Sequence, residues 1–136
     1  GGGNITAQKI VPTASCNGSY AIVKTVKVNA VNSTNTSMTA KVNLNLTNLP
    51  AALKTANMKY FISESSSDAC TTPTGTFASS GNSKQIATFN VAAGATVNKT
   101  YYLKIWLANN PAGNPASEQG QSFTITYTGT LEQNAS

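Results

Sequence analysis

The chain has 136 residues and a net charge of +5, and 40% of its residues are hydrophobic while 10% are charged. This length predicts a single domain with its own core. The chain contains no histidine, which excludes Ser/His/Asp and Cys/His catalytic arrangements. Its basic residues are nine lysines scattered from Lys9 to Lys104, without a run and without arginine, so we expect no nucleic-acid partner.

The first segment with a strand pattern is residues 4–13, whose apolar residues are Ile5, Ala7, Ile10 and Val11. We expect a strand here, and the rest of the domain offers it no evident partner. We therefore divide the chain into an N-terminal strand or tail over residues 1–14 and a single β-sandwich domain over residues 15–136. The alternatives are that this segment folds back on its own sheet or forms a disordered tail.

The two cysteines, Cys16 and Cys70, are far apart and form no CxxC motif. We expect one structural disulfide if the compartment is oxidising, and two buried thiols if it is reducing. We expect a mildly basic surface, with lysine as its only cation, either to keep β-edges from associating or to meet an anionic wall or matrix. No stretch reaches the roughly 18 apolar residues of a membrane span, so we expect no span in this chain.

Alternation of apolar and polar residues predicts strands along the rest of the chain. It is clearest in three segments: 38–47, 97–107 and 123–131. Weaker candidates are 20–31, 58–63, a short piece around Phe77, and 85–91. Residues 50–57 follow Pro50 and suit a helical turn or two. The pattern predicts an all-β, antiparallel β-sandwich of the jelly-roll or Ig-like kind, with about seven to eight strands.

The four carboxylate side chains, Glu64, Asp68, Glu118 and Glu132, lie on different predicted turns or strand ends, so we expect no pair for acid–base catalysis. Glu64 and Asp68 share a loop, where a weak calcium site is the alternative to a solvated loop. No glycine-rich phosphate loop occurs. We therefore expect no catalytic residue, no metal and no cofactor, and a protein that is not an enzyme.

Aromatic residues gather near the end of the chain, where Trp106 accompanies Tyr101, Tyr102 and Phe123. Alternation places Trp106 and Tyr102 on the face opposite Tyr101, so an exposed sugar-stacking platform is one interpretation. The other is that a partner sheet or the turn over residues 109–115 covers Trp106.

Seven Asn-x-Ser/Thr sequons are candidate N-glycosylation acceptors in an exported protein. They begin at Asn4, Asn17, Asn32, Asn35, Asn45, Asn98 and Asn134.

From Tyr60 onward the chain reads YFISESSSDAC, TGTFASSG, AAGATVNKTYYLKIWLANN and EQGQSFTITYTGTLEQ in that order. This resembles the TasA and camelysin family of secreted matrix-fibre proteins and the related bundling pilins of archaea. The matching residues are Tyr101, Tyr102, Leu103, Ile105, Trp106, Leu107, Gln119, Gly120 and Phe123. The acidic turn usual in that family is Ala108-Asn109-Asn110 here.

The resemblance implies a jelly-roll-like sandwich that polymerises by donor-strand exchange, in which each subunit's N-terminal strand completes a sheet of the next. Ile5, Ala7, Ile10 and Val11 are then the anchors of the donated strand. We therefore expect an extracellular filament subunit, a pilus or biofilm-matrix fibre, whose partners are identical subunits, with wall or matrix glycans as a further contact. The alternatives are a monomeric cell-surface stalk or adhesin and a carbohydrate-binding module.

Overall fold

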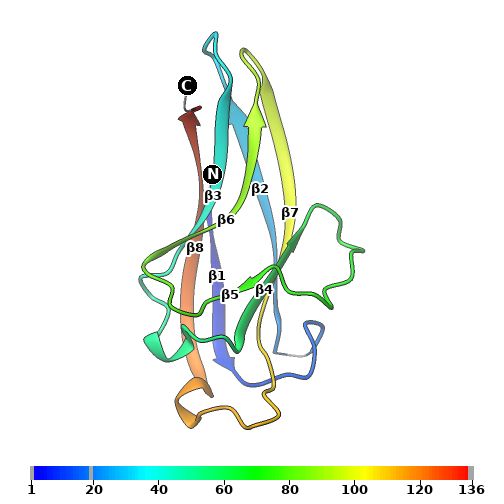
Figure 1. Cartoon of the computed structure of the whole chain (residues 1–136), viewed down its shortest axis with the longest axis vertical. Coiled ribbons are helices and arrows are strands. Elements are labelled where there is room, and N and C mark those ends of the chain that lie inside the picture. The colour runs from blue at the N-terminus through cyan, green and yellow to red at the C-terminus, as the bar shows by residue number, and fades with distance from the viewer. Residues whose placement is uncertain (1, 19, 135–136) are drawn as a thin grey trace.

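Eight strands form two antiparallel sheets that face each other in the computed structural model, which describes residues 2–18 and 20–134 (Figure 1). In spatial order, the first sheet holds β1 (Gly2–Ile10), β8 (Gln121–Gln133), β3 (Met38–Asn45) and β6 (Ser83–Val91). The second holds β2 (Ile22–Val31), β7 (Thr96–Leu107), β4 (Met58–Ser63) and β5 (Gly75–Thr76). The predicted all-β sandwich is confirmed.

The strand order is that of a jelly roll. β1 pairs with β8, β2 with β7, β3 with β6 and β4 with β5, which is the pairing of one long antiparallel hairpin rolled into two sheets. The ladders β3–β8 and β4–β7 then complete the two sheets. Almost every pairing therefore joins strands that are distant in the sequence.

Alternation along each strand decides which side chains form the core. On β3, Ala40, Val42 and Leu44 are at most 1% exposed, while the residues between them are only partly buried or exposed. β7 and β8 show the same pattern. The buried residues of the main core are Ile5, Ala7, Ile10, Val26, Val28, Val42, Leu44, Leu46, Leu49, Leu53, Met58, Tyr60, Phe77, Ile86, Tyr101, Leu103, Ile105, Leu107, Phe123, Ile125 and Tyr127. This core includes side chains from β1, so the N-terminal strand shares it with residues 15–134.

Within the described ranges, the helical content is two short 3-10 turns, η1 (Ala51–Leu53) and η2 (Ala116–Glu118). Each follows a proline, and Leu53 anchors η1 because its side chain is fully buried. The helical turn expected within residues 50–57 is thus present but short. The turn at η2 was not expected. No helix among the residues described here is long and apolar enough to cross a membrane.

Candidate functional site

Strand β1 forms one edge of the first sheet and pairs with β8 of its own chain. Ile5 lies opposite Ile125, and the ladder continues as far as Ile10. The expectation that this segment lacks a partner within its own domain is wrong, and the alternative, that it folds back on its own sheet, describes the structure. The alternation of residues 4–13 identifies a strand, but its partner is set by a contact with residues more than a hundred positions away.

Three of the four expected anchors of β1 lie in the core. Ile5 and Ile10 are 1% exposed and Ala7 is 7% exposed. A register shift between Ala7 and Ile10 lets both side chains point inward although they are three residues apart. Val11 follows the strand and is only half-buried. Burying an isoleucine of this kind stabilises a fold by about 1.5–3 kcal/mol, so β1 contributes substantially to the core.

Small and large side chains face each other between β1 and β8. Gly3 is opposite Tyr127 and Ala7 is opposite Phe123. A Cβ atom on Gly3 would lie 2.7 Å from Cε1 of Tyr127 and 3.0 Å from both Cζ and Oη, which is closer than van der Waals contact permits. The ring of Tyr127 therefore occupies the space that a side chain at position 3 would need. We call the surface of β8 and β2 against which β1 packs the β1 seat.

The chain just after β1 is held at two fixed points. At the end of the strand, the carbonyl oxygen of Ile10 accepts a hydrogen bond from the N–H of Gly120 at 2.6 Å. Further on, the N–H of Thr13 donates to the carbonyl oxygen of Leu107 at 2.9 Å. Residues 11 and 12 lie between these points, and residue 12 is a proline, which has no N–H to donate. A release of β1 that leaves Thr13 in place must therefore turn the backbone at these two residues.

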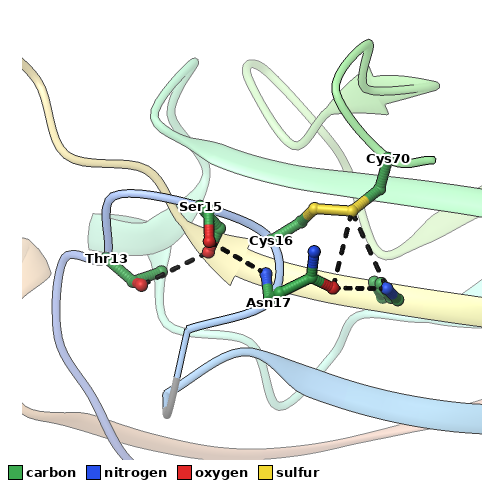
Figure 2. The surroundings of a disulfide bond; sticks show 6 residues. Thr13, Ser15, Cys16, Asn17 and Cys70 are labelled. Carbon is green, nitrogen blue, oxygen red and sulfur yellow. Dashed lines mark hydrogen bonds between the residues drawn. A yellow bond between two sulfur atoms is a disulfide. The ribbon is translucent and has the colours of Figure 1, made fainter.

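The predicted disulfide joins Cys16 to Cys70, whose Cα atoms are 6.4 Å apart (Figure 2). It ties the segment that follows β1 to the loop between β4 and β5. Beside it, Nζ of Lys104 donates a hydrogen bond to Oδ1 of Asn17 at 2.7 Å and lies 3.7 Å from Sγ of Cys70. The covalent bond thus anchors the base of β1 to the second sheet.

Trp106 packs beneath the disulfide. It is 4% exposed and clusters with Cys16 and Cys70, although it points away from the main core, as alternation predicts. The interpretation that Trp106 is covered is confirmed, but its cover comes from the segments joined by the disulfide rather than from the turn over residues 109–115. An indole buried in this way does not present a stacking face to a sugar.

The first sheet continues beyond the start of β1. Residues 129–133 of β8 pair with β3 on one side, and in the described part of the chain no strand pairs with them on the other. A cleft of about 140 Å³ lies here between β8 and the end of β2, and Val28, Ala30, Ala40 and Leu131 are among its lining residues. In Figure 1 the end of β8 accordingly lies above β1 along the sandwich.

The acidic residues have separate partners. Glu64 forms an ion pair with Lys99 at 2.8 Å, and the hydrogen bond from the lysine to Glu64, followed by the charge of this carboxylate, raises the pKa of Lys99. Asp68 instead accepts a hydrogen bond from the hydroxyl of Ser63. Within residues 2–18 and 20–134, no group of three or more Cys, Asp and Glu side chains is placed to hold a metal ion.

Glu118 is a buried polar residue whose burial the sequence did not indicate. It is 1% exposed, and its carboxylate accepts hydrogen bonds from Thr55 Oγ1 at 2.5 Å, from Asn57 Nδ2 at 3.1 and 3.2 Å, and from Asn114 Nδ2 at 3.1 Å. These neutral donors come from the loop after η1 and the loop after β7. Glu118 therefore joins two loops at the end of the sandwich where β1 ends at Ile10. Periodicity carries no signal for a contact of this kind.

The sequons differ in accessibility. Asn32 is 1% exposed, and its Nδ2 donates to the carbonyl oxygens of Thr36 and Val91 at 2.8 and 3.0 Å. A glycan on Asn32 is incompatible with this packing, so this residue is a structural amide that ties β2 to the β6–β7 turn. The other six acceptor side chains are exposed: Asn4, Asn17, Asn35, Asn45, Asn98 and Asn134.

Comparison of the chain with protein-family models, curated proteins and solved structures finds no match.

Proposed function

We propose that the chain is a structural subunit of an extracellular filament, such as a pilus or a biofilm-matrix fibre, assembled head to tail by exchange of β1. The observation that carries this proposal is that β1 is an edge strand whose buried side chains fill a seat built by the rest of the chain. The resemblance of residues 60–133 to the TasA and camelysin family and to archaeal bundling pilins supports it.

Exchange of β1 between molecules conserves the contacts that the strand makes. A β1 strand from a neighbouring molecule would make the same hydrogen bonds and bury the same Ile5, Ala7 and Ile10 as the chain's own strand. The hydrogen bonds and apolar burial that opening removes are therefore restored in the neighbouring molecule. The equilibrium between closed monomers and exchanged polymer then depends on the hinge at residues 11 and 12 and on the entropy of association. Donor and seat are different surfaces, so the contact is heterologous and repeats into an open polymer.

The proposal includes a setting and a partner. The Cys16–Cys70 disulfide suits an oxidising extracellular environment. The partners are identical subunits, with wall or matrix glycans as a secondary contact for the lysine-containing surface. In this role the chain acts through its fold and has no catalytic function, cofactor, metal or nucleic-acid partner.

A second candidate is a monomeric cell-surface stalk or adhesin domain. The observation that favours it is the pairing of β1 with β8 of the same chain. In that case β1 stays in its own sandwich at every concentration. A carbohydrate-binding role through Trp106 has less support because the indole is covered.

Locking β1 in place tests the proposal. Thr6 and Thr124 are cross-strand partners on the outer face, with their hydroxyls 3.3 Å apart. The variant Thr6→Cys/Thr124→Cys, purified and oxidised as a monomer, keeps β1 in its own seat. We expect electron microscopy and sedimentation to show no filaments from the locked monomer and filaments after mild reduction.

The matched control is Lys41→Cys/Thr130→Cys, which links β3 to β8 on the same outer face at a position where β8 has no partner in β1. This control should form filaments whether oxidised or reduced. Filaments from the locked Thr6→Cys/Thr124→Cys monomer would exclude strand exchange. Monomers from the unmodified chain at every concentration would support the stalk or adhesin instead.

A further inference from the structure

We infer that the order of small and large side chains along β1 sets the register in which the strand seats, and that Gly3 beneath Tyr127 is the deciding position. The inference deepens the proposed strand exchange by saying which strand the seat accepts. The register itself is a property of the seat, whichever molecule supplies β1.

The inward side chains of β1 run small, large, small. Gly3, Ile5 and Ala7 lie opposite Tyr127, Ile125 and Phe123, respectively. The two aromatic rings of β8 thus face the two smallest inward positions of β1. Tyr127 is 7% exposed and Phe123 is 5% exposed, so both rings are packed on most sides.

The backbone alone does not prevent β1 from slipping. A shift by two residues keeps the same face of β1 inward and preserves the hydrogen-bonding pattern. In the direction of Gly129, the edge of β8 is unpaired among the described residues, and the cleft beside it can receive side chains. A slip in this direction is therefore open to the main chain.

Side-chain volume opposes the slip. A shift of two residues toward Gly129 places Ile5 opposite Tyr127, and a shift the other way places it opposite Phe123. Either move brings the β-branched side chain of Ile5 against a ring of β8 that faces glycine or alanine in the native register. Overpacking of this kind lowers the population of the slipped register relative to the native register by roughly tenfold or more. The position of glycine in β1 therefore selects the native register.

The strand β1 of a second copy of the chain meets this requirement, because it carries glycine opposite Tyr127. A strand with a side chain opposite Tyr127 can seat in this register only if the ring moves. Each two-residue slip would move a donated strand by about 6.8 Å, so a single register keeps the spacing of subunits constant along a polymer.

Exchanging two side chains within β1 tests the inference. The variant Gly3→Ile/Ile5→Gly has the same composition, but its glycine lies opposite Tyr127 only after a slip of two residues toward Gly129. A reporter chain carries cysteines in place of Thr6, Thr124 and Thr126, three outward positions. Native register pairs position 6 with 124, and the slipped register pairs it with 126.

Linked positions are mapped by mass spectrometry after equilibration in a thiol redox buffer. With the natural β1 sequence we expect mainly 6–124 links. In the exchanged variant, the ratio of 6–124 to 6–126 links should fall by about tenfold or more. The control Asn4→Val adds a β-branched side chain to the exposed face of the same strand and should leave the ratio unchanged. An unchanged ratio in the exchanged variant overturns the inference.

If the exchanged variant does not fold, a double-mutant cycle decides. Gly3→Val should lower the hydrogen-exchange protection of β1 amides, and the loss should be several-fold smaller when Tyr127 is replaced by leucine. Equal losses in both backgrounds overturn the inference. A denaturing gel separates this result from the proposed function, because it shows whether the links lie within or between chains while mass spectrometry reports the register.

Discussion

Truncating Ile5 measures how much β1 contributes to the sandwich. Its side chain is 1% exposed and lies opposite Ile125, so Ile5→Ala removes three buried carbon atoms from between the sheets. At about 0.8 kcal/mol for each buried carbon, with a further cost for the cavity, we expect a loss of about 3 kcal/mol in the free energy of unfolding. For a chain of this length that lowers the melting temperature by about 10 °C.

The assay is urea unfolding followed by circular dichroism, with the disulfide intact and the protein dilute enough to remain monomeric. Thr6→Ala is the matched control, because Thr6 is the next residue of the same strand and points to solvent. Its effect should stay within about 0.5 kcal/mol. If Ile5→Ala costs no more than Thr6→Ala, residues 2–10 do not fill the core and the β1 seat described above is wrong.

Three further predictions concern the rest of the sandwich. Replacing Cys16 and Cys70 by alanine opens a loop with a sequence separation of 54, and the free energy of unfolding should fall by about 4 kcal/mol in urea titrations; a change below about 1 kcal/mol would contradict the anchoring role of the disulfide. Glu118→Gln replaces one acceptor oxygen by a donor among the Thr and Asn donors around it, so thermal unfolding should show a loss of about 1.5–3 kcal/mol, and an unchanged melting temperature would refute the buried acceptor. Burial raises the pKa of Tyr60 and of Tyr101, and the charge of Glu64 is a second cause at Tyr101. The neutral forms of these tyrosines therefore stabilise the fold fully below the ordinary tyrosine pKa of about 10. This stability is lost as the pH rises through the folded-state pKa. Replacing either tyrosine by phenylalanine should therefore shift unfolding, followed by circular dichroism against pH, to higher pH, and an unshifted curve would contradict this.

The strands and their inward faces were largely predictable from the sequence. The alternation over residues 38–47, 97–107 and 123–131 corresponds to β3, β7 and β8, and the segment 58–63 has the bounds of β4. Alternation is a local consequence of burying one face of a strand, so it can be recognised without knowledge of the neighbours. The predicted disulfide also required only two cysteines far apart in the sequence.

Contacts between distant segments were not predictable. The partner of β1 is β8, and the cover over Trp106 comes from segments near Cys16 and Cys70. The donors around Glu118 lie up to 63 residues away from it in the sequence. These contacts follow from how the long hairpin rolls into two sheets, and no local pattern in the sequence encodes that step. The role of Gly3 likewise follows from its position opposite Tyr127, which no local pattern in the sequence indicates.

The most direct measurement of strand exchange is the connectivity of assembled material. Filaments of Thr6→Cys/Thr124→Cys are allowed to form under reducing conditions, then oxidised and separated on a denaturing gel without reductant. Exchange of β1 between neighbours predicts a ladder of covalent dimers, trimers and longer chains. Monomers alone, with the 6–124 link closed inside each chain, would show that every molecule keeps its own β1 and would contradict the proposed assembly.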